Sequence, residues 1–450
     1  MIAPGYLLRS IRTTFTMVSK IASDSRKLLL PPDDVRGMTE LDREKFRSTI
    51  QFPSIQISKK LIGRVVGSPG IKNYTIDKLS AIKPISDGPT PETKVILFDP
   101  AALTPEIRFS ILDGLEKVTS EKFEFGTTDI QLTYDHWDIK RAIKAILPDG
   151  LEFHGYSQVG HIAHLNLREE MLPFKKIIGQ LLVDKVSWVK TVVNKTDSIA
   201  TEFRSFDMEL LAGEPIYETQ MVEQGVTYKL DFRKVFWNSR LGTEHARIVK
   251  KLDKNSVVFD IFAGVGPFAI PAVKKGVKAV FANDKNPNST HYMAENVKLN
   301  HLSLAPIKIY TLDATDFIRD VIGPNILTSH SEATPEEQLT FHSIMNLPAI
   351  AVDFLHDFRG LLHGSGANFE ELKRHQFIVH CHMFVKAKED VKQEWYAVEA
   401  ERIVHSKLKL WHVKFDEVHN VRKVAGRKEM YCVSVTLPWE YLFEKVPNGI

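Results

Sequence analysis

One short stretch constrains the fold of this chain more than any other. Residues 257–273 read VVFDIFAGVGPFAIPAV, an apolar run that ends in Asp260 and is followed by Gly264 and Gly266. Glycine adopts backbone conformations that other residues avoid, and it lets the backbone come close to a ligand. The residues after this turn favour a short helix that ends at Gly276. The stretch therefore predicts a buried strand, a glycine turn and a helix, the repeating unit of a parallel sheet.

Further strands are predicted downstream, and a polar residue follows each of them. The run VKAVFAND ends in Asp284, IKIYTL is followed by Asp313, and FHSIMNLPAIAVDFL carries Asn346 and Pro348. From about residue 238 onward, strands and helices alternate, which indicates a parallel sheet covered on both faces. We expect the polar residues at these four strand ends to converge on one cleft.

The charge at the glycine turn favours one class of ligand. A dinucleotide site needs a G-x-G-x-x-G turn for the pyrophosphate, and that pattern tolerates Ala269 in place of the third glycine. Asp260, however, places a negative charge just before the turn, where it repels phosphate and suits an amine-bearing cation. S-adenosylmethionine, which carries an ammonium and a sulfonium, is such a ligand. A nucleotide site and a structural strand turn are the alternatives.

The turn after the fourth strand indicates the chemistry. Asn346-Leu347-Pro348 resembles the Asn-Pro-Pro-aromatic turn of amine-directed methyltransferases, without the aromatic residue that stacks on the target. In that turn the Asn carbonyl and a neighbouring backbone oxygen hold a nitrogen nucleophile against the methyl group. A plain strand-end turn is the alternative interpretation.

The remainder of the chain divides into parts of different composition. Residues 1–35 form a basic tail, residues 36–150 a small α+β domain and residues 151–235 a β-rich module, before the α/β domain of residues 236–450. Strands are predicted at TKVILFDP, GHIAHLNL and LVDKVSWVKTVVNK, helices at LTPEIRFSILDGL, IKRAIKAILPDG and LPFKKIIGQLL, and a hairpin at YETQMVEQGVTYKLDF. The polar stretch SHSEATPEEQLTFHS predicts a surface loop or short helix.

Composition excludes several classes of protein. The net charge of the 450 residues is only +3, so a nucleic-acid partner has to be met by local basic patches. Cys381 and Cys432 are the only cysteines, which indicates a reducing compartment and neither a disulfide framework nor a zinc cluster. No window has the apolar length of a membrane span.

The first residues have the composition of a mitochondrial transit peptide. They carry several Arg, Lys, Ser and Thr, have no acid before Asp24, and can place apolar side chains on one helical face. A disordered basic tail is the alternative. Met17 offers a second start that would delete most of this segment. We therefore expect the protein in the mitochondrial matrix and also in the cytoplasm and nucleus.

These motifs together make the chain resemble a known family, the archaeal and eukaryotic tRNA (guanine-37-N1)-methyltransferases. The resemblance runs from about residue 155 to the C-terminus. It is carried by GHIAHLNLREEMLPFKKIIGQLLVDK, NKTDSIATEFRSFDMELLAG, NSRLGTEHARI, DIFAGVGPFAIPA, NDKNP, MNLP and VRKVAGRKEMYCVSVTLP. It implies a Rossmann-like class I methyltransferase domain preceded by a β-rich RNA-binding module and a small N-terminal domain. It also implies S-adenosylmethionine as methyl donor, no metal, and a monomer that meets tRNA at its anticodon loop and outer corner.

The resemblance assigns roles to three residues for the reaction itself. Guanine N1 is a poor nucleophile until it loses its proton, so the site needs a base near N1 and a positive charge near O6. Glu244 matches the family's proposed general base, and Arg204 the arginine that stabilises the developing charge. Asn346 would orient the guanine edge. The alternatives are that Glu244 pairs with Arg240 or Arg247 on a helix and that Arg204 is a surface phosphate contact.

Further residues match the donor site of the family. His245, Asp260 and Gly264 would contact the methionine end, and His245 stands where arginine is common. The remaining donor contacts implied are Asp284 with Lys285 at the ribose, Asp313 with Ala314 at the adenine, and Asn346 with Pro348 in the turn that lines the pocket. Asp284 as a helix N-cap is the alternative.

The histidines of HCH require a separate interpretation. His380 and His382 lie two residues apart, which on a strand places them on one face, but no third ligand follows at a fixed spacing. A sheet strand with polar neighbours is favoured, and no metal is assigned. Two rival functions remain: aminocarboxypropyl transfer from the same donor, as in wybutosine synthesis, and a non-catalytic RNA-binding protein on the same fold.

Overall fold

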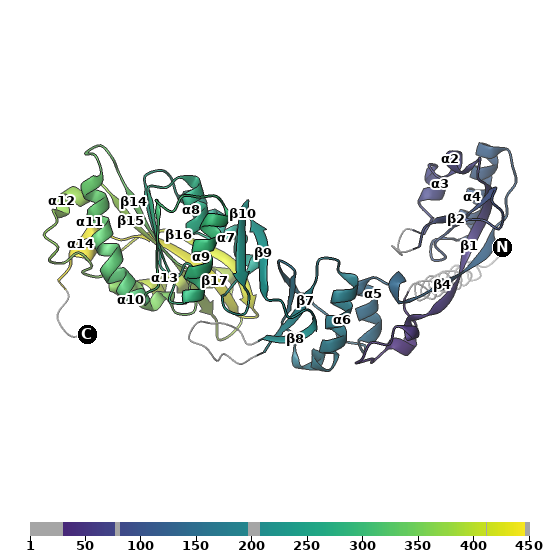
Figure 1. The fold of residues 1–450 in the computed structure, drawn as a ribbon, viewed down its shortest axis with the longest axis horizontal. Coiled ribbons are helices and arrows are strands. Elements are labelled where there is room, and N and C mark those ends of the chain that lie inside the picture. Colours follow the sequence, from purple (N-terminus) through teal and green to yellow (C-terminus); the bar gives the residue numbers. More distant parts are fainter. Residues whose placement is uncertain (1–29, 77–81, 197–207, 411, 446–450) are drawn as a thin grey trace, which may run out of the picture. The chain divides into compact units, whose positions relative to one another are not determined.

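A computed structural model of the chain describes residues 30–76, 82–196, 208–410 and 412–445 (Figure 1). The described chain forms two compact units. Unit 1 comprises the residues up to Tyr156 together with Leu165–Asn194 and Leu210–Glu214, and unit 2 comprises the others. Residues 1–29 of the predicted transit peptide or tail, and Arg204, lie outside the described residues. The tail prediction was wrong at its end, because Asp33–Val35 form a short helix and Val35 is buried. The division at residues 35, 150 and 235 stays a prediction.

Unit 1 is built on a four-stranded antiparallel sheet. Strand β1 (Ser48–Ser58) pairs with β3 (Thr93–Leu97) on one side and β4 (Gly126–Leu132) on the other, and β2 (Ile85–Asp87) pairs with β3. Helix α4 (Pro105–Thr119) buries Ile111 and Leu115 against this sheet, and Thr104 caps its first turn as the sequence predicts. The smaller helices are α2 (Ile62–Val65), α3 (Pro69–Lys72), η1 (Asp33–Val35), η2 (Glu44–Phe46) and η3 (Tyr134–His136).

Two longer helices complete unit 1. Helix α5 (Ile139–Ile146) packs against α6 (Lys175–Lys185), where Asp184 accepts hydrogen bonds from Tyr134 and Arg43. Helix α6 extends through LVDK, so the prediction of a strand beginning there was wrong at its start; β7 covers only Thr191–Lys195. Packing of Leu181 and Leu182 in the core overrides the β propensity of this run. The unit also contains η4 (Glu169–Phe174) and most of β8 (Met208–Gly213).

Unit 2 is dominated by a seven-stranded mixed sheet with the order β13-β12-β11-β14-β15-β17-β16. The first five strands in that order are parallel, and β17 and β16 are antiparallel additions. The strands are β11 (Ser256–Asp260), β12 (Ala279–Asn283), β13 (Ile307–Tyr310), β14 (Thr340–Met345), β15 (Gln376–Lys386), β16 (Phe415–Ala425) and β17 (Lys428–Thr436). The chain order reverses between β11 and β14, and ligands of open α/β sheets bind at such a switch point.

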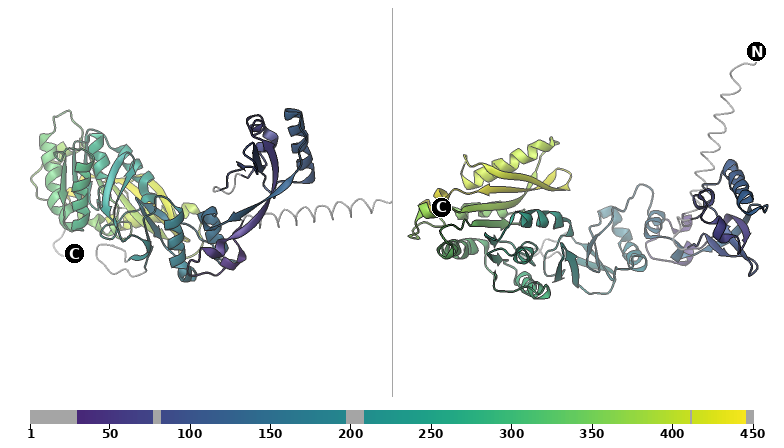
Figure 2. Two further views of the ribbon diagram at one scale, coloured as in Figure 1. Left: turned by 45° about the vertical axis from the view of Figure 1, so that its right-hand side comes forward. Right: turned by 90° about the horizontal axis from the view of Figure 1, so that it is seen from above.

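Helices cover both faces of this sheet (Figure 2). The helices of the domain are α7 (Gly242–Lys251), α8 (Ala269–Lys275), α9 (Pro287–Leu299), α10 (Ala314–Phe317), α11 (Gly323–Glu332), α12 (Phe369–Leu372), α13 (Gln393–Leu408) and α14 (Trp439–Phe443), with η5 (Ser239–Leu241), η6 (Ile318–Ile322) and η7 (Ala351–Phe358). The polar stretch SHSEATPEEQLTFHS begins as a helix, because residues 329–332 belong to α11. The prediction of a surface loop or short helix was wrong at its end, because residues 340–343 belong to the buried strand β14.

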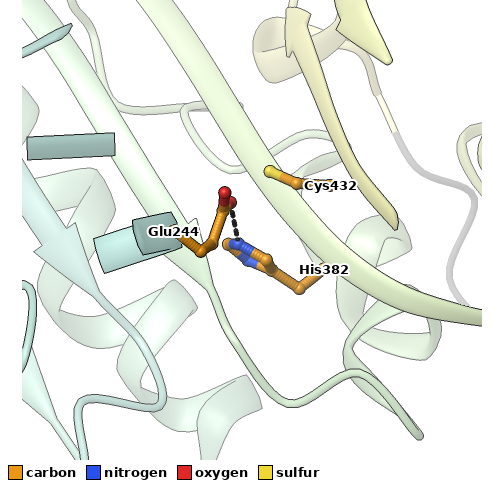
Figure 3. A group of neighbouring side chains, drawn as sticks. All are labelled: Glu244, His382 and Cys432. Carbon is orange, nitrogen blue, oxygen red and sulfur yellow. Dashed lines mark hydrogen bonds and ion pairs between the residues drawn. The ribbon is translucent and has the colours of Figure 1, made fainter. Parts of the chain in front are cut away.

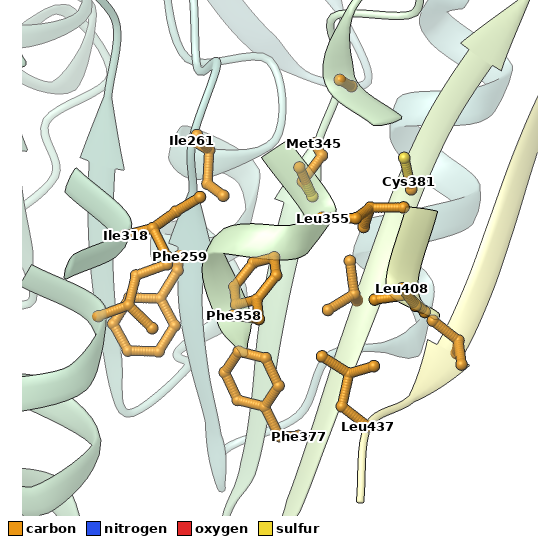
Figure 4. Close-up of a cluster of buried hydrophobic side chains, with 14 of the residues drawn as sticks. Phe259, Ile261, Ile318, Met345, Leu355, Phe358, Phe377, Cys381, Leu408 and Leu437 are labelled. Carbon is orange, nitrogen blue, oxygen red and sulfur yellow. The ribbon is translucent and has the colours of Figure 1, made fainter. Parts of the chain in front are cut away.

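The largest core lies on one face of the sheet, between the strands and α10, η6, η7 and α13 (Figure 4). Phe259 stacks on Phe281 and Phe341, so the strand that carries Asp260 is fixed by aromatic packing on both sides. Cys381 belongs to this core, whereas its neighbours in sequence, His380 and His382, face the other side of β15.

Two hairpins precede this domain in unit 2. Strand β9 (Glu218–Glu223) pairs with β10 (Val226–Asp231) through the two-residue turn Gln224-Gly225, in which both residues have positive φ. This confirms the predicted hairpin. Strand β5 (Ser157–Val159) pairs with β6 (Ile162–Leu165). None of the helices in the described part of the chain is long and apolar enough to cross a bilayer.

Candidate active site

The four predicted strand ends converge at one edge of the sheet. Ile261 N–H donates to the Ile344 carbonyl, which ties the end of β11 to β14, and Ala263 N–H donates to the Asn283 carbonyl, which ties it to β12. Because β11, β12, β13 and β14 are parallel, the residues after them share this edge. The four strand ends therefore lie at one edge of the sheet, as expected, and the cleft that they would line stays a prediction.

Asn283 organises this edge, and no motif in the sequence predicted its role. Its side-chain amide donates to the carbonyls of Ile261 and Leu312, and its carbonyl oxygen accepts from Leu312 N–H. The two loops after β11 and β13 are thus held by one buried side chain at the end of β12. Asn283 was missed because a single Asn inside an apolar strand has no diagnostic spacing.

The glycine turn after β11 has the backbone that only glycine adopts easily. Gly264 has φ +55° and Gly266 has φ +95°. A Cβ at Gly264 would meet no atom within 4 Å, so space remains beside this backbone, whereas a Cβ at Gly266 would lie 2.8 Å from Ile270. Gly264 therefore borders open space, and Gly266 allows the packing of the helix that follows.

Asp260 is a fully buried carboxyl whose two oxygens accept no hydrogen bond of regular geometry among the described residues, although the backbone N–H of Ala269 lies close enough to lower its pKa slightly. Burial, and after it the nearby charge of Asp284, raise the pKa of Asp260 well above its ordinary value. An ionised carboxylate is costly in such a place unless a cation joins it. The site consequently favours a ligand with an ammonium group.

The second and third strand ends also carry their predicted acids. Asp284 Oδ2 accepts from Gly264 N–H at 2.9 Å, and Asp284 Oδ1 accepts from Asn286 N–H at 2.9 Å. Helix α9 is capped by Asn286, so the N-cap interpretation of Asp284 was wrong. Asp313 caps α10 through Thr315 N–H, lies 3.2 Å from the Lys285 ammonium and precedes the buried Ala314.

The fourth strand end is the Asn346-Leu347-Pro348 turn. The side-chain oxygen of Asn346 is buried and lacks a hydrogen-bond partner among the described residues. The Pro348 carbonyl accepts from Phe384 N–H of β15 at 2.8 Å, which fixes the turn. A buried acceptor without a donor costs free energy, and a ligand N–H would remove that cost.

Glu244 lies in the first turn of α7 and is 2% exposed. Its Oε1 accepts from His382 Nε2 and from Arg247 Nη2, both at 2.7 Å, and its Oε2 accepts from Arg247 Nε at 2.7 Å (Figure 3 shows the pair with His382). Burial opposes ionisation, but the hydrogen bonds from Arg247 and His382 hold the pKa of Glu244 well below its ordinary value. The pairing with Arg247 that the sequence left open is therefore present.

His382 adjoins both Glu244 and Cys432, and the ligand atoms of the three residues lie within 4.8 Å of one another (Figure 3). Burial alone would lower the pKa of His382, but Cys432 and Glu244 raise it to about 10. Glu, His and Cys together are a zinc-type ligand set. Arg247 and His382 already donate hydrogen bonds to the carboxylate, however, so we interpret the group as a hydrogen-bonded network. Of the HCH histidines only His382 belongs to this group. Its partners Glu244 on α7 and Cys432 on β17 are far away in the sequence, so no ligand spacing predicted the cluster.

His245 is joined to the β9–β10 hairpin. Its Nδ1 lies 2.6 Å from Glu223 Oε1, and its ring packs edge-on against Phe268 with centroids 4.8 Å apart. The ring centroid of Phe268 also lies 6.0 Å from that of His382 on β15, so the residues after the glycine turn adjoin both α7 and β15. His245 further lines a cavity of about 300 Å³ with Tyr228 and with residues of α7 and α8.

The fold and this edge define the class of the protein. A parallel α/β sheet with two antiparallel additions, a glycine turn after its first strand and acids after the next two is a Rossmann-like class I methyltransferase domain. Residues 219–406 match the family model of the TRM5/TYW2 methyltransferase domain, and residues 139–216 match the TYW2 N-terminal domain.

Whole-chain relatives give the particular family. The chain is 38% identical to the tRNA (guanine(37)-N(1))-methyltransferase of Caenorhabditis elegans over 95% of this chain and 94% of that protein. It is 37% identical to the Homo sapiens protein of the same name, over 98% of this chain and 85% of that protein. The chain belongs to the tRNA (guanine(37)-N(1))-methyltransferase family.

Solved structures agree with the fold. The structure of aTrm5 in complex with tRNALeu has a TM-score of 0.57 to this chain at 23% identity, and covers 86% of this chain and 100% of that one. Trm5b from Pyrococcus abyssi has a TM-score of 0.55 at 22% identity, and the match covers 86% of this chain and 99% of that one.

Proposed function

We propose that this chain transfers a methyl group from S-adenosylmethionine to N1 of guanine 37 of tRNA, the base 3′ of the anticodon. The observation that carries the proposal is the unpartnered Asp260 carboxyl at the strand ends, beside the helix that holds Glu244. Relatives that align with almost the whole chain and bear the name of this reaction support the choice of substrate.

The strand ends fit the donor. Asp260 would hold the ammonium group, and the open backbone at Gly264 would accommodate the methionine end beside His245. Asp284, which accepts the backbone N–H groups of Gly264 and Asn286 and interacts with the Ser289 hydroxyl, would also accept a hydrogen bond from a ribose hydroxyl, with Lys285 alongside. Asp313 and Ala314 would meet the adenine. When bound, the donor supplies an electrophilic methyl group.

The guanine requires a base, an acceptor and a cation. Glu244 would take the N1 proton, and the side-chain oxygen of Asn346 would accept from an N–H of the guanine edge. Pro348 holds the turn that carries Asn346. The positive charge near O6 is assigned to Arg204, which lies outside the described residues. Because a loop guanine is already partly unstacked, extruding it costs less than in a duplex.

One experiment separates this function from its two rivals. Unmodified tRNA is incubated with the protein and with donor labelled in the methyl group, and the tRNA is then digested. Labelled 1-methylguanosine supports methyl transfer. A carboxypropyl nucleoside without the label would instead identify aminocarboxypropyl transfer, and the absence of any product would favour a binding protein.

The reaction needs no metal, so a chelator should leave the rate unchanged. The protein acts as a monomer that contacts the anticodon loop and the outer corner of tRNA, which light scattering and footprinting would test. It is present in the mitochondrial matrix, cytoplasm and nucleus; N-terminal sequencing of each pool would show a single form beginning at Met1 if this is wrong.

A further inference from the structure

Under the proposed function, on which this inference rests, Glu244 accepts a proton that must leave the site again. The carboxylate is 2% exposed and is enclosed by Arg247 and His382. His382 is itself fully buried and paired with the same oxygen, Oε1. A base that is shielded from water needs a route by which its proton reaches solvent before the next turnover. Among the residues that the structure describes, Oε2 accepts a hydrogen bond from Arg247 Nε alone, and the route therefore begins at this oxygen.

His419 stands beside that oxygen. Its Nε2 lies 3.8 Å from Glu244 Oε2, and its side chain is 38% exposed whereas that of Glu244 is 1% exposed. Strand β16 places it there by register: His419 lies opposite Cys432 on β17, and Cys432 lies opposite His382 on β15. Cross-strand neighbours share a face of a sheet, so His382, Cys432 and His419 form one row beneath α7.

The groups around His419 favour its neutral form. Burial, and then the positive charge of Arg247 on α7, lower the pKa of His419 below its ordinary value, and His382 on β15 acts in the same direction. Glu244 on α7 and Glu417 on β16 oppose this effect. A neutral imidazole has a free nitrogen lone pair and can accept a proton at neutral pH.

We propose that His419 relays the proton from Glu244 to solvent during catalysis. The guanine N1–H bond breaks as the proton passes to Glu244 Oε2, and the N1 lone pair forms the bond to the methyl carbon. The carbon–sulfur bond of the donor breaks with its electron pair remaining on sulfur. Glu244 then passes its proton to His419 Nε2, and the imidazolium releases one proton to water. The 3.8 Å separation requires a small side-chain approach or one bridging water.

The test is the multiple-turnover rate of the full chain with His419→Ala, with unmodified tRNA and donor. The relay predicts a fall of about tenfold to a hundredfold, with unchanged dissociation constants for donor and tRNA. Imidazole added to the buffer should restore a large part of the rate in His419→Ala, because it fills the space that the side chain leaves. His419→Gln should be slow and should not respond, since its side chain occupies that space without a titratable group.

Two controls make the outcome decisive. His291 on α9 is an exposed histidine that pairs with Glu295, and His291→Ala should leave the rate unchanged with and without imidazole. A full rate in both His419 variants, or a loss in His419→Ala that imidazole does not restore, overturns the relay and leaves the site chemistry intact. Wild-type protein that forms no 1-methylguanosine overturns the proposed function and the relay together.

Discussion

Arg247 holds both oxygens of the Glu244 carboxylate, from three residues further along the same helix. Its Nε and Nη2 each lie 2.7 Å from one oxygen, and its Nη1 lies 2.5 Å from Glu417 Oε2. An exposed pair at this spacing contributes about 0.2–0.5 kcal/mol, but this pair is mostly buried, and bidentate geometry also fixes the direction of the carboxylate. Arg247 therefore sets both the orientation and the charge of the proposed base.

Replacing Arg247 should change the pH dependence of the reaction. Without the guanidinium, the pKa of Glu244 should rise, because burial then acts against a carboxylate that only His382 compensates. The rate of Arg247→Met should accordingly begin to fall at a higher pH than the wild-type rate as the buffer is acidified. Arg247→Lys keeps the charge and should lie between the two. Identical acidic limbs in all three proteins would show that Glu244 is not the titrating base.

Glu244→Gln should abolish most of the turnover without lowering the affinity for the donor. Glutamine keeps the shape of the side chain but cannot accept a proton, so the rate should fall by about a hundredfold or more. Because the predicted donor contacts lie at the strand ends, calorimetry should give a donor affinity within about twofold of wild type. A variant that turns over at the full rate would exclude Glu244 as the base.

Donor binding should release a proton, and Asp260 should be its source. The raised pKa of Asp260 in the free protein means that a cationic ligand favours the ionised form, so affinity should increase as the pH rises through that pKa. Calorimetry in buffers of different ionisation enthalpy would measure this release. Asp260→Asn should eliminate the proton release. It should also raise the dissociation constant of the donor by tenfold or more, which corresponds to about 1.4 kcal/mol.

Asp260 should also limit the stability of the donor-free protein. A carboxyl whose pKa is raised in the folded state stabilises the fold below its unfolded pKa, and this contribution is lost as the pH rises through the folded pKa. Asp260→Asn should therefore raise the melting temperature more at pH 8 than at pH 5 when no donor is present. A melting temperature that falls equally at both pH values would contradict the unpaired state of this carboxyl.

Gly264 and Gly276 form a matched pair for the glycine turn. Both have positive φ, of +55° and +81°, and neither has an atom within 4 Å of an added Cβ. Alanine at either position should cost about 1 kcal/mol of folding stability through backbone strain. Only Gly264→Ala should also reduce donor affinity, since Gly276 merely ends α8. An equal effect of the two variants on donor binding would place the donor elsewhere.

Salt should affect the affinity for tRNA much more than the affinity for the donor. Phosphate contacts release counterions, so tRNA affinity should fall by orders of magnitude between about 50 and 200 mM salt. Donor affinity, which depends on a single buried charge, should change little over the same range. Titrations of both ligands at several salt concentrations would compare the slopes, and equal slopes would contradict the assignment of tRNA as partner.

The sequence by itself determined the parallel-sheet domain, the glycine turn, the acids at the strand ends and the hairpin at Gly225. Each of these depends on residues that are neighbours in the chain, and local periodicity or turn geometry reveals them. Only the tertiary structure decided what surrounds Glu244. Arg247 was visible as a helical neighbour, but His382, Cys432, Glu417 and His419 come from three later strands, and their meeting depends on sheet order and register. The protonation states of Asp260 and Glu244 likewise follow from burial and from the partners that packing supplies, and neither is written in local sequence.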